Sequence, residues 1–301
     1  MNSEEMLSTL YTAARDRGIE FSEEFIPIQG EFNTGPVTLK YLEWGDPRQP
    51  TLLLLHGFAQ TAHSWDLVSL GLADKFHLIS LDQRGHGDSD WAPDGDYSLE
   101  AQQKDLQKFV SYIDVDRINL IGLSMGGRNS YVFASENPDL VSTLVVVDTG
   151  PRGIRTGGNR IRNFVNMPDV LDTFDEFVER VHSYVPHRSL DQIRGSLANN
   201  IRQMNNGKWT WKYDRLLRSP DYRRPAMSDE KLWNYWEAIQ CKTLIVRGEK
   251  SDVLATETLD EMTKRNKNSK AVVVPNSGHL VTGDNPSGLV KIIQSWFDGC
   301  F

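Results

Sequence analysis

Short runs of hydrophobic residues recur along the chain, separated by longer segments with helical spacing. Residues 37–44 alternate apolar and polar positions, which is typical of an outer β-strand. The other runs are mostly apolar without alternation and have the length of a strand: 51–55, 78–81, 118–121, 144–147, 244–246 and 271–274. Such strands are buried on both faces, as in a parallel sheet covered by helices.

Helical patterns lie between these predicted strands. Leu99, Leu106 and Phe109 recur near helical spacing within residues 99–113. Further helices are predicted over 4–16, 125–136, 256–265 and 287–297. Because strands and helices alternate, we expect an α/β fold: a mostly parallel central sheet, flanked by helices and joined by right-handed crossovers.

One long segment, residues 152–238, interrupts this alternation. No strand is evident there, and 171–181 and 190–204 have helical character. A structureless loop of this length is uncommon, so the segment is predicted to be a helical insertion. The core would then comprise 1–151 and 239–301, with 1–20 as an N-terminal helical extension.

Charge divides along the same boundaries. The 301 residues have a net charge of −8, but the insertion holds 15 basic and 11 acidic residues, leaving −12 for the rest. An acidic chain is a poor candidate for binding nucleic acid, which needs a basic surface. Two cysteines do not make a disulfide framework, and no apolar run spans a membrane. Without a recognisable secretory signal, a cytoplasmic location is expected, and the oligomeric state is undetermined.

The motif with the clearest chemistry is Gly122-Leu-Ser124-Met-Gly126, between the predicted strand 118–121 and helix 125–136. A G-x-S-x-G sequence at a strand-to-helix junction is typical of a nucleophile elbow, which exposes the serine hydroxyl at a sharp turn. Glycines allow the neighbouring backbone to approach closely. Ser124 is therefore the predicted nucleophile.

A serine nucleophile needs a base and an acid that orients the base. Among seven histidines, His279 follows the last predicted strand, and Asp252 follows the strand before it. The order serine, aspartate, histidine is the order that this type of fold uses. Glu249 and Asp148 are rival acids, but Asp252 fits the motif order best.

Two more segments complete a resemblance. His56-Gly-Phe58 follows the strand at 51–55, and the sequence DQRGHG at 82–87 follows the strand at 78–81. With these motifs in order, residues 35–301 resemble the α/β-hydrolase family. The resemblance implies an oxyanion hole formed by the backbone N–H groups of Phe58 and Met125, and it implies that the insertion is a lid. Some members place the acid where Asp148 stands.

The resemblance implies a serine hydrolase that cleaves carboxylic esters of small, largely apolar substrates through an acyl-enzyme. Serine at position 124 disfavours the members that use aspartate or cysteine there. No cofactor or metal is expected, because no His/Cys cluster has zinc spacing and no dinucleotide-binding motif occurs. A lactonase and a carbon–carbon bond hydrolase use the same triad. A ligand receptor with slow or no turnover is the alternative from another class.

An aromatic-rich lid predicts an apolar pocket mouth for a small ester or lactone. The residues expected to line the pocket are Trp65, Trp209, Trp211, Trp233, Trp236, Val253 and Leu280. Each of the tryptophans has an alternative role in packing.

Overall fold

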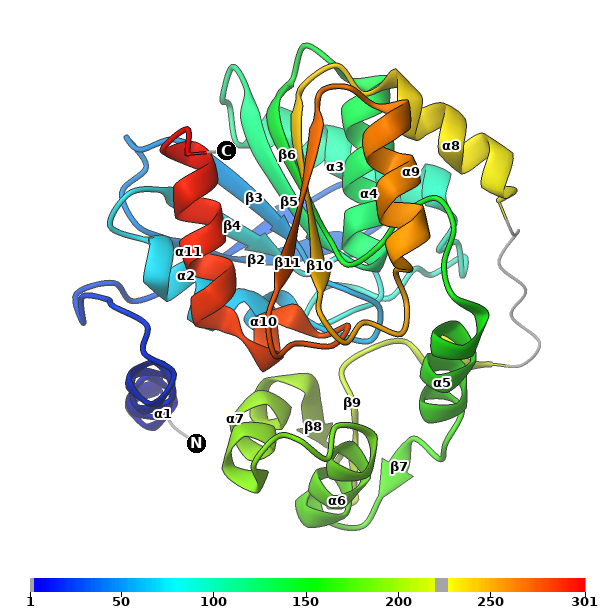
Figure 1. Ribbon diagram of the computed structural model, residues 1–301. Helices are drawn as coiled ribbons and strands as arrows, with labels where there is room; N and C mark the ends of the chain where they lie inside the picture. The colour runs from blue at the N-terminus through cyan, green and yellow to red at the C-terminus, as the bar shows by residue number, and fades with distance from the viewer. Residues whose placement is uncertain (1–2, 220–226, 301) are drawn as a thin grey trace.

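A central sheet of eight strands organises most of the chain, whose computed structural model describes residues 3–219 and 227–300 (Figure 1). The strand order is β1-β2-β4-β3-β5-β6-β10-β11. Strands β1 and β2 are antiparallel to their neighbours, and the other six strands, β4, β3, β5, β6, β10 and β11, run parallel to one another. The strands are β1 Ile28–Asn33, β2 Thr38–Trp44, β3 Thr51–Leu55, β4 His77–Leu81, β5 Ile118–Leu123, β6 Val141–Val147, β10 Lys242–Gly248 and β11 Ser269–Val274.

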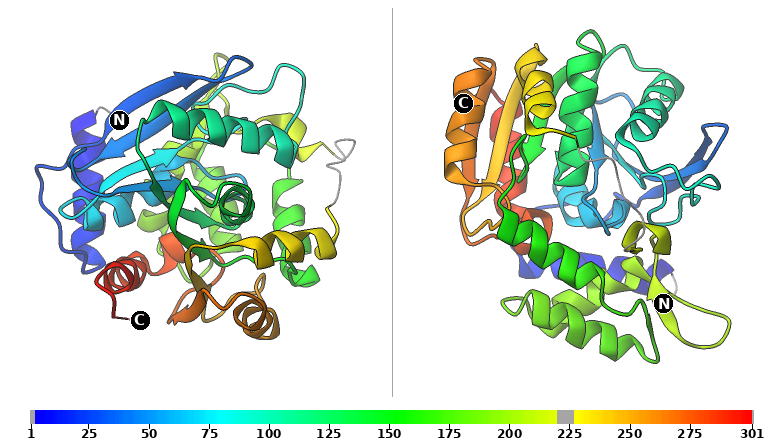
Figure 2. Two further views of the ribbon diagram at one scale, coloured as in Figure 1. Left: turned by 90° about the horizontal axis from the view of Figure 1, so that it is seen from above. Right: turned by 90° about the vertical axis from the view of Figure 1, so that its right-hand side faces the viewer.

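Helices cover both faces of this sheet (Figures 1 and 2). The leucines of β3 show why the strands lack alternation: Leu53 and Leu55 belong to one hydrophobic core, and Leu52 and Leu54 to the core on the opposite face. The first core includes side chains of α3 (Leu99–Tyr112), α4 (Met125–Glu136), α8 (Asp229–Ala238) and α9 (Thr256–Arg265). The second includes side chains of α1 (Ser3–Asp16), α2 (Asp66–Leu72), α10 (Val281–Asp284) and α11 (Pro286–Phe297).

The predicted α/β architecture is confirmed, and each predicted strand and core helix is present within a few residues. Strand β1 was not predicted. Its sequence, IQGEFN, is mostly polar and its side chains are exposed or half-buried, because it lies at the edge of the sheet. An edge strand of this kind has little hydrophobic pattern to reveal it.

The insertion, named the lid after its position, lies below the carboxyl ends of the parallel strands (Figure 1). The prediction that it contains no strand is wrong, because a three-stranded antiparallel sheet joins its helices. These strands are only two or three residues long, too short to show a period of two. The lid elements are α5 (Arg155–Val165), β7 (Val170–Leu171), α6 (Phe174–Tyr184), α7 (Leu190–Asn200), β8 (Ile201–Gln203), β9 (Trp209–Trp211) and the 3-10 helix η2 (Arg215–Arg218).

The last helix of the predicted insertion, α8, belongs to the body. It packs mainly against α4 and α9, two helices of the body. Trp236 is fully buried there, and its indole N–H donates to the carbonyl oxygen of Met262 at 2.9 Å. The predicted lid boundary at residue 238 is therefore too far along the chain, because the apolar face of α8 completes the sheet's helical layer.

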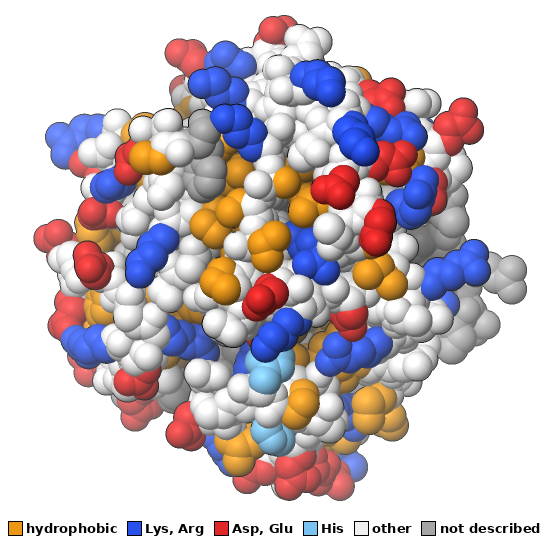
Figure 3. Space-filling model, viewed as in Figure 1, with side chains coloured by type: hydrophobic (Ala, Val, Ile, Leu, Met, Phe, Trp, Pro, Cys, Tyr) orange, Lys and Arg blue, Asp and Glu red, His pale blue; other side chains and the backbone are white. Residues whose placement is uncertain are grey.

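The lid's excess of basic residues is largely offset by ion pairs. Lid cations pair with acids of the body at Arg152–Glu261, Arg160–Asp252, Arg188–Asp284 and Lys212–Asp88. On the face shown in Figure 3, basic and acidic side chains are interspersed. The net charge of the insertion therefore does not form a single basic field on this face.

The expected N-terminal helix is present as α1, which packs against α2 of the body and α7 of the lid. Ala14 of α1 is fully buried, and the Arg17 guanidinium donates to the carbonyl oxygen of Gly283 at 2.8 Å. Helix α1 is thus docked on both parts of the molecule. No helix among the described residues is long and apolar enough to cross a membrane.

Candidate active site

Ser124 lies at a strained turn between β5 and α4. Its backbone has φ 55° and ψ −113°, values that a residue other than glycine rarely adopts. The two motif glycines make the turn possible. A Cβ atom at Gly122 would lie 2.3 Å from the carbonyl oxygen of Gly126, and one at Gly126 would lie 2.2 Å from that of Leu55. The structure therefore has the elbow that the motif predicts.

His279 connects Ser124 to a buried carboxylate. Its Nε2 atom lies 3.0 Å from Ser124 Oγ, and its Nδ1 atom lies 2.8 Å from Asp148 Oδ2. His279 follows β11 and Asp148 follows β6, so both approach Ser124 at the carboxyl edge of the sheet. The three side chains form a continuous hydrogen-bonded series.

Asp148 is held in place by further donors. Its side chain is fully buried, its Oδ1 accepts the N–H of Gly248 at 2.8 Å, and its Oδ2 accepts the hydroxyl of Ser251 at 2.5 Å. These donors fix the position of the carboxylate beside His279. The backbone of Asp148 has φ 51°, which marks a second strained position beside Ser124.

The prediction that Asp252 contacts His279 is wrong. The Asp252 carboxylate pairs with Arg160 of the lid helix α5, at 2.9 Å. Ser251, one residue earlier, faces Asp148 instead. The rival Glu249 is also elsewhere, because its carboxylate accepts the backbone N–H of Asn276.

A signal for Asp148 was available in the sequence, since it directly follows a predicted buried strand. What the sequence lacked was the strand order. Strand β6 lies between β5 and β10 in the sheet, so its end is next to that of the serine strand. The side chain of Asp252, after β10, turns outward to meet Arg160 of the lid.

The two predicted oxyanion donors lie on either side of Ser124. Met125 is the first residue of α4, and the first N–H groups of a helix have no partner within the helix. A Cβ atom at Gly57, next to Phe58, would lie 3.3 Å from Ser124 Cβ, so this loop passes close to the hydroxyl. Phe58 lines the same cavity as Ser124.

A buried histidine braces this loop. His56 Nε2 accepts the backbone N–H of Gln83 at 3.0 Å, and its Nδ1 then donates to the carbonyl oxygen of Gly57 at 2.8 Å. The Gln83 side chain donates in turn to the carbonyl oxygen of His56 at 2.7 Å. Burial lowers the pKa of His56 to about 4, so its ring is neutral near pH 7. The neutral ring fits this one-donor, one-acceptor arrangement.

A cavity of about 940 Å³ opens over Ser124 and His279. The residues that line it include five apolar side chains of the lid: Ile161, Phe164, Val181, Val185 and Leu197. Of the predicted pocket residues, Trp211 and Leu280 line it.

The other predicted pocket residues lie elsewhere. Trp65, Trp233 and Trp236 are buried in the cores of the body, and Trp209 packs edge-to-face on Phe174. The carbonyl oxygen of Val253 accepts the N–H of Ile154, outside the cavity. Large apolar side chains have the same sequence signature whether they line a pocket or fill a core.

The lid is fastened to the loop that bears His279. Asp284 Oδ2 accepts the N–H of Gly278, next to His279, at 2.9 Å, and its Oδ1 accepts the Arg188 Nε–H group at 2.7 Å. Burial opposes ionisation of Asp284, but Arg188 and His187 outweigh it and lower its pKa. The lid and this loop are therefore coupled through one buried carboxylate.

Within residues 3–219 and 227–300, no cluster of three or more His, Cys, Asp or Glu side chains could hold a metal ion. A serine hydroxyl, an imidazole and a buried carboxylate thus lie in a hydrogen-bonded series at the cavity, an arrangement that can supply a nucleophile, a base and an orienting acid.

Comparison with known proteins identifies the family. The family model described as the alpha/beta hydrolase fold matches residues 50–286. The chain belongs to the α/β-hydrolase family. It is accordingly a hydrolase, as the motif order and the fold indicated.

Two curated relatives cover most of this α/β hydrolase. An esterase of Mycobacterium tuberculosis, Rv0045c, is 28% identical over 264 residues, which cover 85% of each chain. Its crystal structure matches with a TM-score of 0.79 at 27% identity, covering 97% of this chain and 98% of that one. A 3-hydroxybutyrate-oligomer hydrolase of Cupriavidus necator is 28% identical over 274 residues, covering 87% of this chain and 93% of its own.

Proposed function

We propose that this hydrolase cleaves carboxylic esters of small, largely apolar substrates through an acyl-enzyme on Ser124. The observation that carries the proposal is the hydrogen-bonded series Ser124–His279–Asp148 at the floor of the cavity. A serine, a histidine and a buried carboxylate in this order are the components of a catalytic triad.

The first half of the reaction forms the acyl-enzyme. His279 Nε2 takes the proton of Ser124 Oγ as this oxygen bonds to the ester carbonyl carbon. The resulting oxyanion is stabilised by the N–H groups of Phe58 and Met125. The tetrahedral intermediate then collapses, the bond to the alkoxy oxygen breaks, and His279 gives its proton to the departing alcohol.

The second half regenerates the enzyme. His279 takes a proton from water as the water oxygen bonds to the acyl carbon. The bond between this carbon and Ser124 Oγ then breaks, His279 gives its proton to Oγ, and the carboxylic acid leaves. Asp148 accepts the Nδ1–H bond throughout, which fixes the tautomer of His279 and stabilises its charged form. Asp148 thus replaces Asp252 as the proposed acid.

Two considerations favour ester cleavage over the alternatives. Both relatives described above have ester-cleaving names, an esterase and a hydrolase of hydroxybutyrate oligomers. The apolar lid side chains that line the cavity fit the hydrocarbon part of an ester. An aligned triad favours turnover over a purely ligand-binding role. Comparing the hydrolysis rates of p-nitrophenyl butyrate and γ-butyrolactone separates an esterase from a lactonase.

The acid assignment provides the test. With p-nitrophenyl butyrate as substrate, Asp148→Asn is expected to lower kcat by roughly 10³–10⁴-fold, because an amide cannot hold the required tautomer. Asp252→Asn removes a partly exposed carboxylate that pairs with Arg160 of the lid. We expect this substitution to change kcat less than about 3-fold.

Ser124→Ala serves as the control for background hydrolysis. A strong loss in Asp252→Asn with little change in Asp148→Asn would reject the assignment of the acid. Absence of Ser124-dependent hydrolysis of any activated ester would reject the esterase proposal itself.

A further inference from the structure

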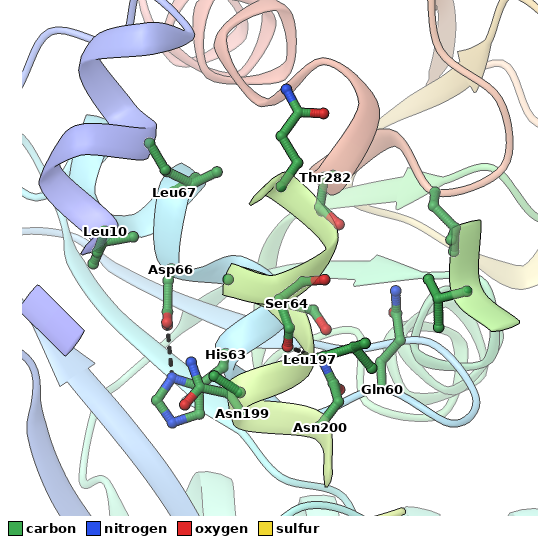
Figure 4. Close-up of a pocket in the computed structure, with 18 of the residues that line it drawn as sticks. Leu10, Gln60, His63, Ser64, Asp66, Leu67, Leu197, Asn199, Asn200 and Thr282 are labelled. Atoms are coloured by element: carbon green, nitrogen blue, oxygen red, sulfur yellow. Dashed lines mark hydrogen bonds and ion pairs between the residues drawn. The ribbon is translucent and has the colours of Figure 1, made fainter. Parts of the chain in front are cut away.

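The cavity extends beyond Ser124 and His279. It continues between the N-terminal helix α1 and the lid helix α7, which lie side by side in Figures 1 and 2. Figure 4 shows Leu10 of α1 and Leu67 of α2 at one side, with Leu197 of α7 toward the other. The groove therefore joins three parts of the chain far apart in sequence.

The two helices approach closely where α7 has a glycine. A Cβ atom at Gly195 would have Thr9 Cγ2 of α1 as its nearest neighbour, at 3.9 Å. That distance is ordinary van der Waals contact, so one methyl group fits but a larger side chain has to extend into the groove. Gly195 thus marks the narrow, open space between the helices.

The lining of this groove is compatible with a hydrocarbon chain. Three of its hydroxyl groups donate to backbone carbonyls of their own helices: Thr9 to Glu5, Thr12 to Ser8 and Ser196 to Ile193. Polar side chains, among them Gln192 and Asn199, line it as well. Covering a polar group that keeps its hydrogen bond costs little compared with covering one that loses it. Met6, Leu10 and Ala13 of α1 add apolar surface.

The size of the cavity also exceeds what a short ester needs. At about 940 Å³ it is near the upper end of small-molecule sites, which run from roughly 300 to 1,000 Å³. An acetate or butyrate ester at Ser124 would leave the α1–α7 groove empty. A longer chain would bury apolar surface there, which is favourable by about 0.8 kcal/mol per methylene.

We infer that α1 is the distal wall of the substrate site, and that the preferred substrates are esters with a medium-to-long, mainly aliphatic chain lying between α1 and α7. The inference rests on the proposed function, since the chain must start from an ester at Ser124. Gly195 and Ala13, which face the groove from opposite helices, are the specificity-determining positions.

The test narrows the groove at Gly195. Gly195→Leu is expected to lower kcat/KM for p-nitrophenyl octanoate and decanoate at least ten-fold, while p-nitrophenyl acetate changes less than two-fold. Gly195→Ala is the matched control, because its methyl group fits, and its selectivity should equal that of the wild type. Alkyl acetates from ethyl to decyl repeat the comparison with the chain on the alcohol side.

Ala13→Leu narrows the groove from α1, with Ala13→Ser as its control, and should produce the same selective loss. Long-chain discrimination in either ester series supports the inference. An unchanged long-to-short ratio in both Leu variants, or an equal loss on acetate and decanoate in folded protein, overturns it.

Calorimetric measurement of decanoate binding separates this inference from the proposed function. Weaker binding to Gly195→Leu than to Gly195→Ala supports the groove even if no ester is hydrolysed. Equal binding, together with an unchanged ester ratio, rejects the groove while leaving ester hydrolysis at Ser124 intact.

Discussion

At the scale of single residues, hydrogen-bond partners distinguish side chains that look equivalent in the sequence. Asp148 and Asp252 both follow buried strands of the sheet. Asp148 is fully buried and accepts bonds from Gly248, Ser251 and His279. Asp252 is half-exposed and pairs with a lid arginine. The difference of environment, rather than residue type, makes Asp148 the candidate acid.

His56 gives a prediction about pH at the same scale. The unfolded chain binds a proton at His56 near pH 6.5, whereas burial delays protonation in the folded protein to about pH 4. Lowering the pH through this window therefore favours unfolding, by up to about 3 kcal/mol at this site. In urea titrations from pH 4 to pH 8, the stability advantage of the wild type over His56→Gln should shrink as the pH falls.

The quantity to measure is the difference in unfolding free energy between the wild type and His56→Gln. Burial raises the pKa of Asp82 to about 6, which acts in the opposite direction over nearly the same pH range in both proteins. Taking the difference cancels that contribution. Parallel stability curves for the wild type and His56→Gln would show that His56 does not titrate as a buried neutral ring.

At the scale of elements, the junction of β5 with α4 depends on two glycines for steric reasons. Each is close to backbone atoms, which cannot rotate away as a side chain can. The φ of Ser124 places its hydroxyl above the carboxyl edge of the sheet, where the loops after β6 and β11 begin. The sequence motif and the tertiary contacts therefore describe the same constraint.

Gly122→Ala tests this junction. Its methyl group would lie 2.3 Å from the carbonyl oxygen of Gly126, so we expect a loss of unfolding free energy of roughly 3 kcal/mol, with little remaining activity. The matched control is Gly158→Ala in α5, where a Cβ atom would have no atom within 4 Å apart from its chain neighbours and the backbone of its own helix. Alanine favours a helix by about 1 kcal/mol over glycine, so this variant should be equally or more stable in thermal unfolding. Equal stability of both variants would contradict the steric argument.

At the scale of the whole molecule, the lid and body meet at charged contacts as well as at the cavity. The Asp284 carboxylate is almost fully buried and joins Arg188 of the lid to the loop before His279. Arg160 joins α5 to the loop after β10. These contacts, together with α1, make the cavity a product of lid, body and N-terminal helix.

Arg188→Met tests the coupling of lid and body. Removing Arg188 leaves the half-exposed His187 as the ion-pair partner of the buried Asp284 carboxylate. We therefore expect a loss of about 3 kcal/mol in urea unfolding and a lower kcat, because the His279 loop loses an anchor. Arg194→Met removes an exposed lid pair with Asp175 and should cost less than about 0.5 kcal/mol. The coupling is refuted by two variants that behave alike.

Local pattern in the sequence determined the sheet, its covering helices, the elbow at Ser124 and the position of His279. Each depends on residues close together in the chain: apolar runs, helical spacing, and glycines around a serine. Burial of these runs on both faces leaves one architecture, because exposed apolar strands would be unfavourable. Strand β1 and the short lid strands were not predicted because they have almost no such pattern.

Only the tertiary structure decided which acid meets His279, where α8 packs and which residues line the cavity. These depend on the order of strands in the sheet and on contacts between distant segments. Asp148 and Asp252 have similar local surroundings in the sequence, and a tryptophan has the same hydrophobicity in a core as at a pocket. The α1–α7 groove likewise exists only because the fold brings residues 3–16 beside residues 190–200.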